Sequence, residues 1–147
     1  QLFSPTVLED VAFGPLNMGK SRDEAMEIAR NTLNFLGLTG FEDRITYKLS
    51  GGEKKLVSLA TVLAMEPEVL LFDEPTSAMD NNAEMLLRQR MKESLADKTL
   101  LLFTHRTSLL ELVERVVIME AGKVVADGPK AEVLKALKSG AIGAKKR

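Results

Sequence analysis

The stretch EVLLFDEP, residues 68–75, is the clearest indication of the fold class, because an unbroken apolar run ends there in two acidic side chains. A second stretch, KTLLLFTH at residues 98–105, has the same form. Short continuous apolar runs are typical of strands that are buried on both faces of a parallel sheet. A helical pattern at about residues 82–95 lies between the two runs, so together they predict a β–α–β unit in an α/β protein.

The residues before this unit predict helices. Ser21 and Glu24 form a capping-box pattern in front of a helix that Gly37 can end. A second helix is expected to begin at Ser50. The buried face of that helix is expected to contain four aliphatic side chains, Leu56, Leu59, Ala60 and Leu63.

The residues after the unit predict a hairpin and a last helix. Residues 115–120 and 123–126 read as two strands around the turn Ala121-Gly122, and a helix is expected after Pro129. We therefore expect a helical part at residues 1–65, followed by an α/β part at residues 66–147 with a mainly parallel sheet.

Composition excludes several classes of function. The 147 residues fit one domain, with 45% hydrophobic and 28% charged residues and a net charge of −1. This balance gives no general argument for binding nucleic acid or an anionic membrane surface. The absence of cysteine excludes disulfides, thiolate zinc sites and cysteine nucleophiles. No apolar run approaches the roughly 20 residues that a membrane-spanning helix needs.

Polar side chains follow both apolar runs. Asp73 and Glu74 end the first run, and Thr104 and His105 end the second. Ligands of open parallel sheets bind beyond the carboxyl ends of the strands, so these side chains are candidates for one common site. The alternative is that polar residues only mark where each strand emerges into solvent. The occurrence of such residues on two strands favours a site.

The segment LSGGEKK, residues 49–55, places two glycines where a helix is expected to begin. Ser50 and Glu53 can form a capping box, which accounts for these two residues but not for Gly51 and Gly52. Glycine is useful where another molecule approaches the backbone closely. Because a helix N-terminus attracts phosphate, we expect an anion to dock at Ser50, Gly51 and Gly52, with simple capping as the alternative.

Four motifs together resemble the ATP-binding subunit of an ABC transporter. They are LSGGEKK at residues 49–55, VLLFDEP at 69–75, SAMD at 77–80 and FTHR at 103–106, which resemble the signature motif, the Walker B strand, the D-loop and the switch histidine of that family. The order and spacing of the motifs match, and the resemblance covers essentially the whole chain. It is closest to the energy-coupling-factor and cobalt/nickel importer branch.

The resemblance implies roles at the chain's own ATP site. Asp73 would hold Mg²⁺ through water, Glu74 would orient and polarise the attacking water, and His105 would contact the γ-phosphate. The cofactors implied are therefore ATP and Mg²⁺.

The resemblance also implies a second set of residues that faces a partner. Ser50, Gly51 and Gly52 would close over the γ-phosphate of ATP held mainly by a second ABC ATPase subunit, and Asp80 would link the two sites. Glu53 stands where the family usually has glutamine, and it adds a negative charge near this phosphate unless its carboxylate turns back to the cap.

One family motif is absent. The sequence contains no GxxxxGKS or GxxxxGKT, so the phosphate-binding Walker A loop is missing. The fold implied is thus a partial ABC ATPase fold of the P-loop NTPase type. We expect the chain to be a fragment of a longer ATPase subunit, inactive alone, with an exposed sheet edge and apolar surface that could cause self-association.

The resemblance further implies a location on the cytoplasmic face of the membrane, bound to a transmembrane transporter subunit, with no nucleic acid partner. Four apolar residues are candidates for a groove that receives this subunit or, equally, for the helical core: Phe3, Val7, Val11 and Phe13. Two other functions stay open. One is the ATPase head of a chromosome-maintenance or DNA-repair protein, and the other is a non-enzymatic partner-binding module.

Overall fold

The computed structural model describes residues 5–77, 79–95 and 98–140. It divides into two compact units, Gln1–Phe103 and Thr104–Arg147, which are described separately below. The predicted boundary between a helical part at residues 1–65 and an α/β part at residues 66–147 is a different division, and it stays a prediction.

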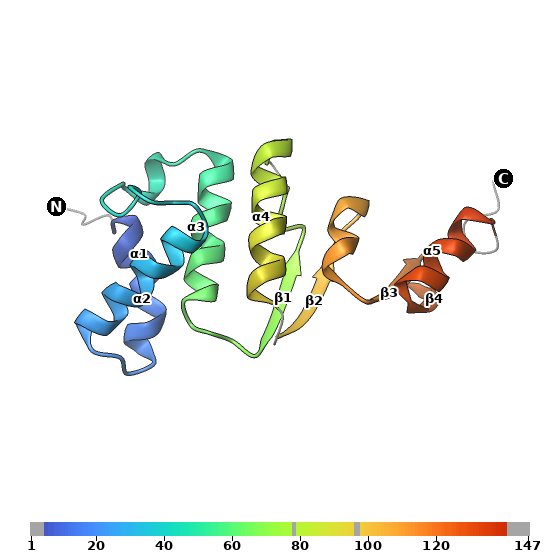
Figure 1. Ribbon diagram of the computed structural model, residues 1–147, viewed down its shortest axis with the longest axis horizontal. Helices are drawn as coiled ribbons and strands as arrows, with labels where there is room; N and C mark the ends of the chain where they lie inside the picture. Colours follow the sequence, from blue (N-terminus) through green and yellow to red (C-terminus); the bar gives the residue numbers. More distant parts are fainter. Residues whose placement is uncertain (1–4, 78, 96–97, 141–147) are drawn as a thin grey trace. The chain divides into compact units, whose positions relative to one another are not determined.

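The first unit begins with three α-helices and a short 3-10 helix. They are α1 (Val7–Asn17), α2 (Arg22–Phe35), η1 (Thr46–Lys48) and α3 (Gly51–Leu63) (Figure 1). Each α-helix starts with a capping box, in which a hydroxyl accepts the N–H of a glutamate three residues later and that glutamate accepts the cap's own N–H. The cap of α2 is Ser21 and that of α3 is Ser50, as predicted; Thr6 caps α1.

Two glycines in the helical part have structural roles. Gly37 has a φ of 74° directly after Leu36, which confirms that it ends α2. A glycine also permits the close approach of α1 to the end of α3. A Cβ on Gly14 would lie 2.6 Å from Cγ of Met65, so the two segments can pack this closely only around a residue without a side chain.

The three α-helices enclose an aliphatic core. Its buried members on these helices are Val7, Val11, Ala12, Ala25, Ala29, Leu33, Val57, Leu59 and Ala60. On α3, Leu59 and Ala60 are buried as predicted, but the prediction for Leu56 and Leu63 was wrong, because both are only half-buried. Val57 is buried instead, because the face that meets the other helices passes through residues 57, 60 and 64 at helical spacing.

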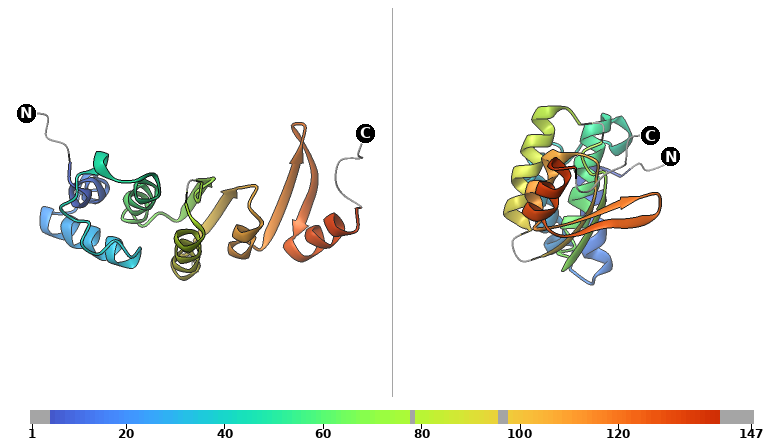
Figure 2. Two further views of the ribbon diagram at one scale, coloured as in Figure 1. Left: turned by 90° about the horizontal axis from the view of Figure 1, so that it is seen from above. Right: turned by 90° about the vertical axis from the view of Figure 1, so that its right-hand side faces the viewer.

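The β–α–β unit completes the first unit of the structure. Strands β1 (Val69–Asp73) and β2 (Thr99–Phe103) pair in parallel, with Leu70 opposite Leu100, and α4 (Asn81–Ser94) connects them. Figures 1 and 2 show α4 beside the two strands. Leu87 and Met91 of α4 are buried, as is Leu70, so this helix covers one face of the sheet.

The sheet is not buried on both faces as its apolar runs suggested, and the exposed apolar surface that we expected for this chain is present on one face. Val69, Leu71, Leu101 and Phe103 are 62%, 63%, 49% and 50% exposed, whereas the alternate residues on both strands are buried or half-buried. A continuous apolar run allows a strand to be buried on both faces, but each face is buried only if another layer of the structure covers it. In the part of the chain that the structure describes, that layer is present on the α4 face alone.

The second unit contains a 3-10 helix, a hairpin and a helix. They are η2 (Thr107–Leu112), β3 (Arg115–Glu120), β4 (Lys123–Pro129) and α5 (Lys130–Lys138). β3 and β4 are antiparallel, and the turn residues Ala121 and Gly122 have φ angles of 49° and 74°, as a two-residue hairpin turn requires. The predicted hairpin and last helix are confirmed.

Arg115 and Lys130 each make two hydrogen bonds that join segments of the second unit. The Arg115 guanidinium donates from Nε and Nη2 to the two carboxylate oxygens of Asp127 at 2.8 and 2.9 Å across the hairpin. Lys130 donates from its N–H to Glu114 O at 2.8 Å and from Nζ to Leu110 O at 2.9 Å, so it ties the start of α5 to the chain before β3. None of the described helices is both long and apolar enough to cross a bilayer.

Candidate functional site

The start of α3 carries the predicted anion site. Ser50 caps the helix, and its hydroxyl accepts the Glu53 N–H at 3.3 Å. Glu53 Oε2 accepts the Ser50 N–H at 2.8 Å, while Glu53 Oε1 lies 3.0 Å from Nη1 of Arg44. Both carboxylate oxygens of Glu53 are therefore engaged within the chain.

These contacts also act on the ionisation of Glu53. The backbone N–H and the hydroxyl of Ser50 hold the pKa of the Glu53 carboxyl below its ordinary value, and the Arg44 charge adds to this. The carboxylate is thus kept ionised by the helix start and by a neighbouring cation, so part of its charge is offset locally.

Gly51 has no conformational or steric reason to be glycine in this chain. An added Cβ at Gly51 would meet no heavy atom within 4 Å, and its φ does not lie in the left-handed region. In the described part of the chain, the N–H groups of Gly51 and Gly52 have no hydrogen-bond partner. These are two of the donors that every helix start leaves open, and they are the donors that bind anions.

The end of β1 carries the two predicted carboxylates. Asp73 is the last residue of the strand and is solvent-exposed. Glu74 follows it with a φ of 46°, which is the left-handed region that a residue with a side chain rarely adopts. Strain of this kind persists only where the surroundings impose it, and it is concentrated at functional sites.

Three hydrogen bonds impose the Glu74 backbone conformation. The Glu74 N–H donates to Phe103 O of β2 at 2.9 Å. Its carbonyl oxygen accepts the Ser77 N–H at 3.1 Å and Nζ of Lys55 at 3.2 Å. Lys55 lies on α3, so this last bond joins the helix that begins at Ser50 to the end of β1.

The turn after Glu74 leads into α4. Met79 N–H donates to Thr76 O at 3.1 Å, and the Thr76 side chain is fully buried with no hydrogen-bond partner for its hydroxyl among the described residues. Asp80 caps α4, and its Oδ1 accepts the Ala83 N–H at 2.8 Å. A local capping role thus accounts for the type of residue at position 80.

His105 belongs to the second unit and is exposed. It lies before η2, next to Arg106, whose N–H donates to the Thr104 hydroxyl at 3.1 Å. The first unit contains every other predicted site residue, so the convergence of His105 with Glu74 stays a prediction.

The carboxylates fit magnesium better than a metal held entirely by protein. Within residues 5–77, 79–95 and 98–140, no three His, Cys, Asp or Glu side chains form a group that could hold a metal ion. Mg²⁺ keeps several waters and binds through one or two carboxylates together with phosphates, so one exposed carboxylate such as Asp73 is enough.

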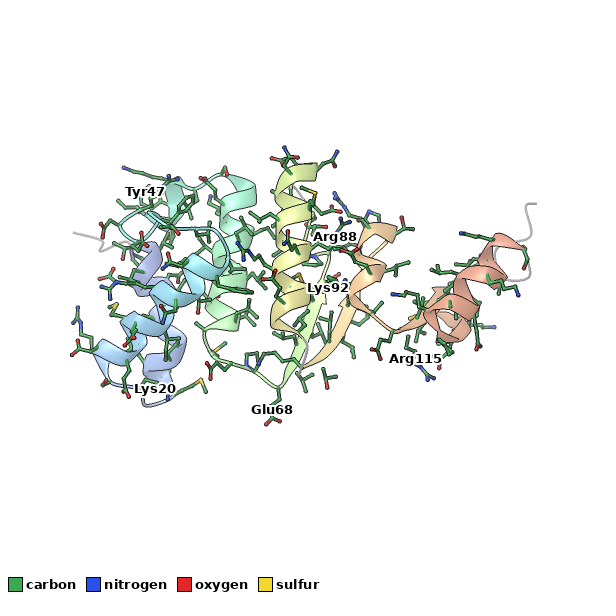
Figure 3. The ribbon with its side chains drawn as sticks, in the orientation of Figure 1. Lys20, Tyr47, Glu68, Arg88, Lys92 and Arg115 are labelled. Atoms are coloured by element: carbon green, nitrogen blue, oxygen red, sulfur yellow. The ribbon has the colours of Figure 1, made fainter. Side chains whose placement is uncertain are left out.

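A groove in the first unit is lined by residues of α1, η1 and α3. It has a volume of about 590 Å³, and its lining includes Phe13, Tyr47 and Met65, which are 66%, 62% and 37% exposed. Tyr47 stands out from η1 in Figure 3. Of the apolar residues predicted for a partner groove, Val7 and Val11 pack in the core, and Phe3 lies outside the described residues.

Sequence reasoning missed Lys55. A single lysine on a predicted helix usually points to solvent, and nothing in LSGGEKK separates Lys55 from Lys54. Only the three-dimensional structure shows that Lys55 reaches a carbonyl oxygen, that of Glu74, while Lys54 is exposed.

Known proteins are similar to this chain in sequence and in fold. A family model described as ABC transporter matches residues 2–77. The energy-coupling factor transporter ATP-binding protein EcfA of Methanothermobacter thermautotrophicus is 40% identical over 137 residues, which make up 92% of this chain and 44% of that protein.

Two solved structures extend the comparison. The structure of cbiO1 from Clostridium perfringens, described as part of the ABC transporter complex cbiONQ, aligns with a TM-score of 0.73 and 33% identity, covering 95% of this chain and 57% of that one. The dimeric post-hydrolysis structure of the ATP-binding cassette MJ0796 with ADP and Pi aligns with a TM-score of 0.76 and 28% identity, covering 85% and 56%. The chain spans about half the length of these relatives.

Proposed function

The chain belongs to the ABC transporter family as an ATP-binding domain, and from this premise we propose that the whole protein hydrolyses ATP to drive import through a membrane subunit. The observation that carries the proposal is the backbone of Glu74. It is held in the left-handed region at the end of β1 by bonds from three segments, directly after a carboxylate suited to Mg²⁺.

The chain's own residues then have separate tasks at one ATP site. Asp73 would hold Mg²⁺ through water, and the ion would offset the charge of the phosphates. Glu74 would orient and polarise the attacking water, and His105 would donate to the γ-phosphate. Phosphoryl transfer depends on positioning and charge stabilisation, which explains why a carboxylate on a firmly held backbone suits it.

The start of α3 serves the ATP site of a second subunit. The open N–H groups of Gly51 and Gly52, with the Ser50 hydroxyl, bind the γ-phosphate held by the partner, and a glycine at position 51 lets the phosphate approach. The Glu53 carboxylate turns back to the cap and to Arg44, so its charge is partly offset and opposes this anion less. Asp80 links the two sites across the interface.

Two partners follow. The dimeric structure of MJ0796 supports a pair of ATPase subunits, either two copies or two different chains. A transmembrane subunit is the second partner, and the groove lined by Phe13, Tyr47 and Met65 is a surface for it. We propose that binding to this subunit keeps the protein at the cytoplasmic face of the membrane.

The branch of the family is the finer part of the proposal. Similarity to a named energy-coupling factor ATP-binding protein and to cbiO1 supports the energy-coupling-factor and cobalt/nickel import branch, with metal ions or vitamins as cargo. The 147 residues contain no GxxxxGKS or GxxxxGKT loop. We therefore expect no ATP turnover from these residues alone.

Phosphate release from Mg-ATP by the whole protein, measured with and without duplex DNA, tests this function. We expect turnover that DNA leaves unchanged. The absence of turnover in the presence of the membrane subunit would contradict the ATPase assignment. Stimulation by DNA would instead favour a chromosome-maintenance or DNA-repair ATPase.

A further inference from the structure

We propose that Lys55 is a positioning residue for hydrolysis, because its ammonium holds the Glu74 backbone in the left-handed conformation. The inference rests on the proposed function, in which Glu74 acts on the attacking water. Lys55 lies in the LSGGEKK segment, but the family resemblance gives it no role, and in this proposal it touches neither nucleotide nor water.

The Glu74 carbonyl oxygen accepts hydrogen bonds from two segments of the chain. Glu74 O accepts Nζ of Lys55 at 3.2 Å in a part-buried contact between residues 19 apart in sequence. The same oxygen accepts the Ser77 N–H at 3.1 Å from the turn that follows. The turn bond is local and moves with the chain, whereas the Lys55 bond anchors this oxygen to another element, α3.

The Lys55 bond opposes rotation of the Glu74 backbone out of the left-handed region. A residue with a Cβ at a φ of 46° relaxes towards the right-handed or extended region unless it is held. Rotation about the Glu74 backbone would swing both its carbonyl and the direction in which its side chain leaves the chain. A charged donor on that carbonyl makes a stronger hydrogen bond than a neutral one, so it resists this rotation.

A second lysine provides a comparison at the other end of the same strand. Nζ of Lys98 donates to Pro67 O at 3.0 Å, just before β1 begins. The two bonds are chemically alike, but only the Lys55 bond lies at the candidate site. If lysine–carbonyl bonds here serve stability alone, losing either one has the same consequence.

The experiment measures kcat and KM for ATP on the whole protein, with Lys55→Met, Lys55→Arg and Lys98→Met. Misplacement of a catalytic group by about 1 Å can cost roughly 100-fold, so we expect Lys55→Met to lower kcat by about 10- to 100-fold with little change in KM. Lys55→Arg, which keeps a charged donor, is expected to recover most of kcat, and Lys98→Met to retain it. Wild-type kcat in Lys55→Met, or an equal loss in Lys98→Met, would overturn the proposal.

Amide hydrogen exchange at Glu74 gives a readout that needs no turnover. The Glu74 N–H is bonded to Phe103 O, so release of the carbonyl anchor is expected to speed its exchange in Lys55→Met but not in Lys98→Met. Unchanged exchange would overturn the proposal even if the protein proved not to be an ATPase. If Lys55→Met does not fold, Lys55→Gln, with a shorter neutral donor, is expected to give intermediate exchange and kcat; wild-type values would contradict the proposal.

Discussion

Glu53 Oε2 accepts the backbone N–H of Ser50 at 2.8 Å, so the carboxylate nearest the candidate phosphate site is turned towards the start of its own helix. Its other oxygen lies 3.0 Å from Arg44. A residue that looks unfavourable for binding an anion is therefore already engaged. The family's usual glutamine would occupy this position with one acceptor oxygen in place of two.

This relationship predicts a mild effect for Glu53→Gln. A glutamine oxygen can still accept the Ser50 N–H in a capping box, so we expect kcat for ATP to stay within about twofold of the wild type. Turnover assays at saturating ATP measure it. A large increase in kcat would mean that the Glu53 charge does oppose the phosphate, contrary to the geometry.

Acid is expected to weaken the helical part through its three capping boxes. The N-cap residues hold the pKa values of Glu9, Glu24 and Glu53 below the ordinary value of 4.5, chiefly through the backbone N–H for Glu9 and Glu53 and through the Ser21 hydroxyl for Glu24. Because these pKa values are lower in the folded state, the stabilisation is present above pH 4.5 and is lost as the pH falls through the folded-state values.

Urea unfolding midpoints at pH 7, 5 and 3 measure this effect. The variant with all three glutamates changed to glutamine is expected to be less stable than the wild type at pH 7 and to lose less stability on acidification. Parallel curves for the two proteins would show that other groups control the acid transition.

Because Glu74 has a left-handed φ, glycine is expected to be more stable than alanine at this position, which reverses their usual order. Alanine keeps the left-handed strain and glycine relieves it, so Glu74→Gly is expected to unfold with a free energy about 1 kcal/mol higher than Glu74→Ala. Chemical denaturation of the two variants measures the difference. A more stable alanine variant would mean that the backbone relaxes out of the left-handed region once the carboxylate is removed.

Thr76 predicts a stabilising substitution beside the site. Its hydroxyl is fully buried without a partner among the described residues, and an unsatisfied buried hydroxyl is costly. We expect Thr76→Val to raise the free energy of unfolding by about 1 kcal/mol. Thr32→Val is the control, because the Thr32 hydroxyl donates to Ile28 O at 2.9 Å, and it is expected to give no gain. A loss of stability in Thr76→Val would show that the hydroxyl is bonded in solution.

Much of the local structure could be predicted from the sequence because it depends on neighbours along the chain. The cap at Ser50, the end of α2 at Gly37 and the hairpin turn at Ala121-Gly122 each follow from backbone chemistry within a few residues. The two apolar runs likewise became paired parallel strands. The helix start at Thr6 has the same S/T-x-x-E pattern and could have been found in the same way.

Features that depend on neighbours in space could not be predicted in this way. Apolar sequence at Leu71 does not tell whether a layer covers it, and the structure leaves this side chain 63% exposed. The left-handed backbone of Glu74 and its bond to Lys55 arise only when α3, β1 and β2 have packed together. The roles of Asp73, Asp80 and His105 come from family resemblance and stay predictions.

The proposed action of Glu74 on the water that attacks ATP can be tested by one comparison of turnover. Steady-state phosphate release by the whole protein is measured for the wild type, Glu74→Gln and Glu68→Gln. Glu68 is the matched control, because it is an exposed glutamate at the opposite end of β1 (Figure 3). We predict that Glu74→Gln lowers kcat by about 100-fold or more with ATP binding retained, and that Glu68→Gln does not. Wild-type turnover in Glu74→Gln would contradict the account.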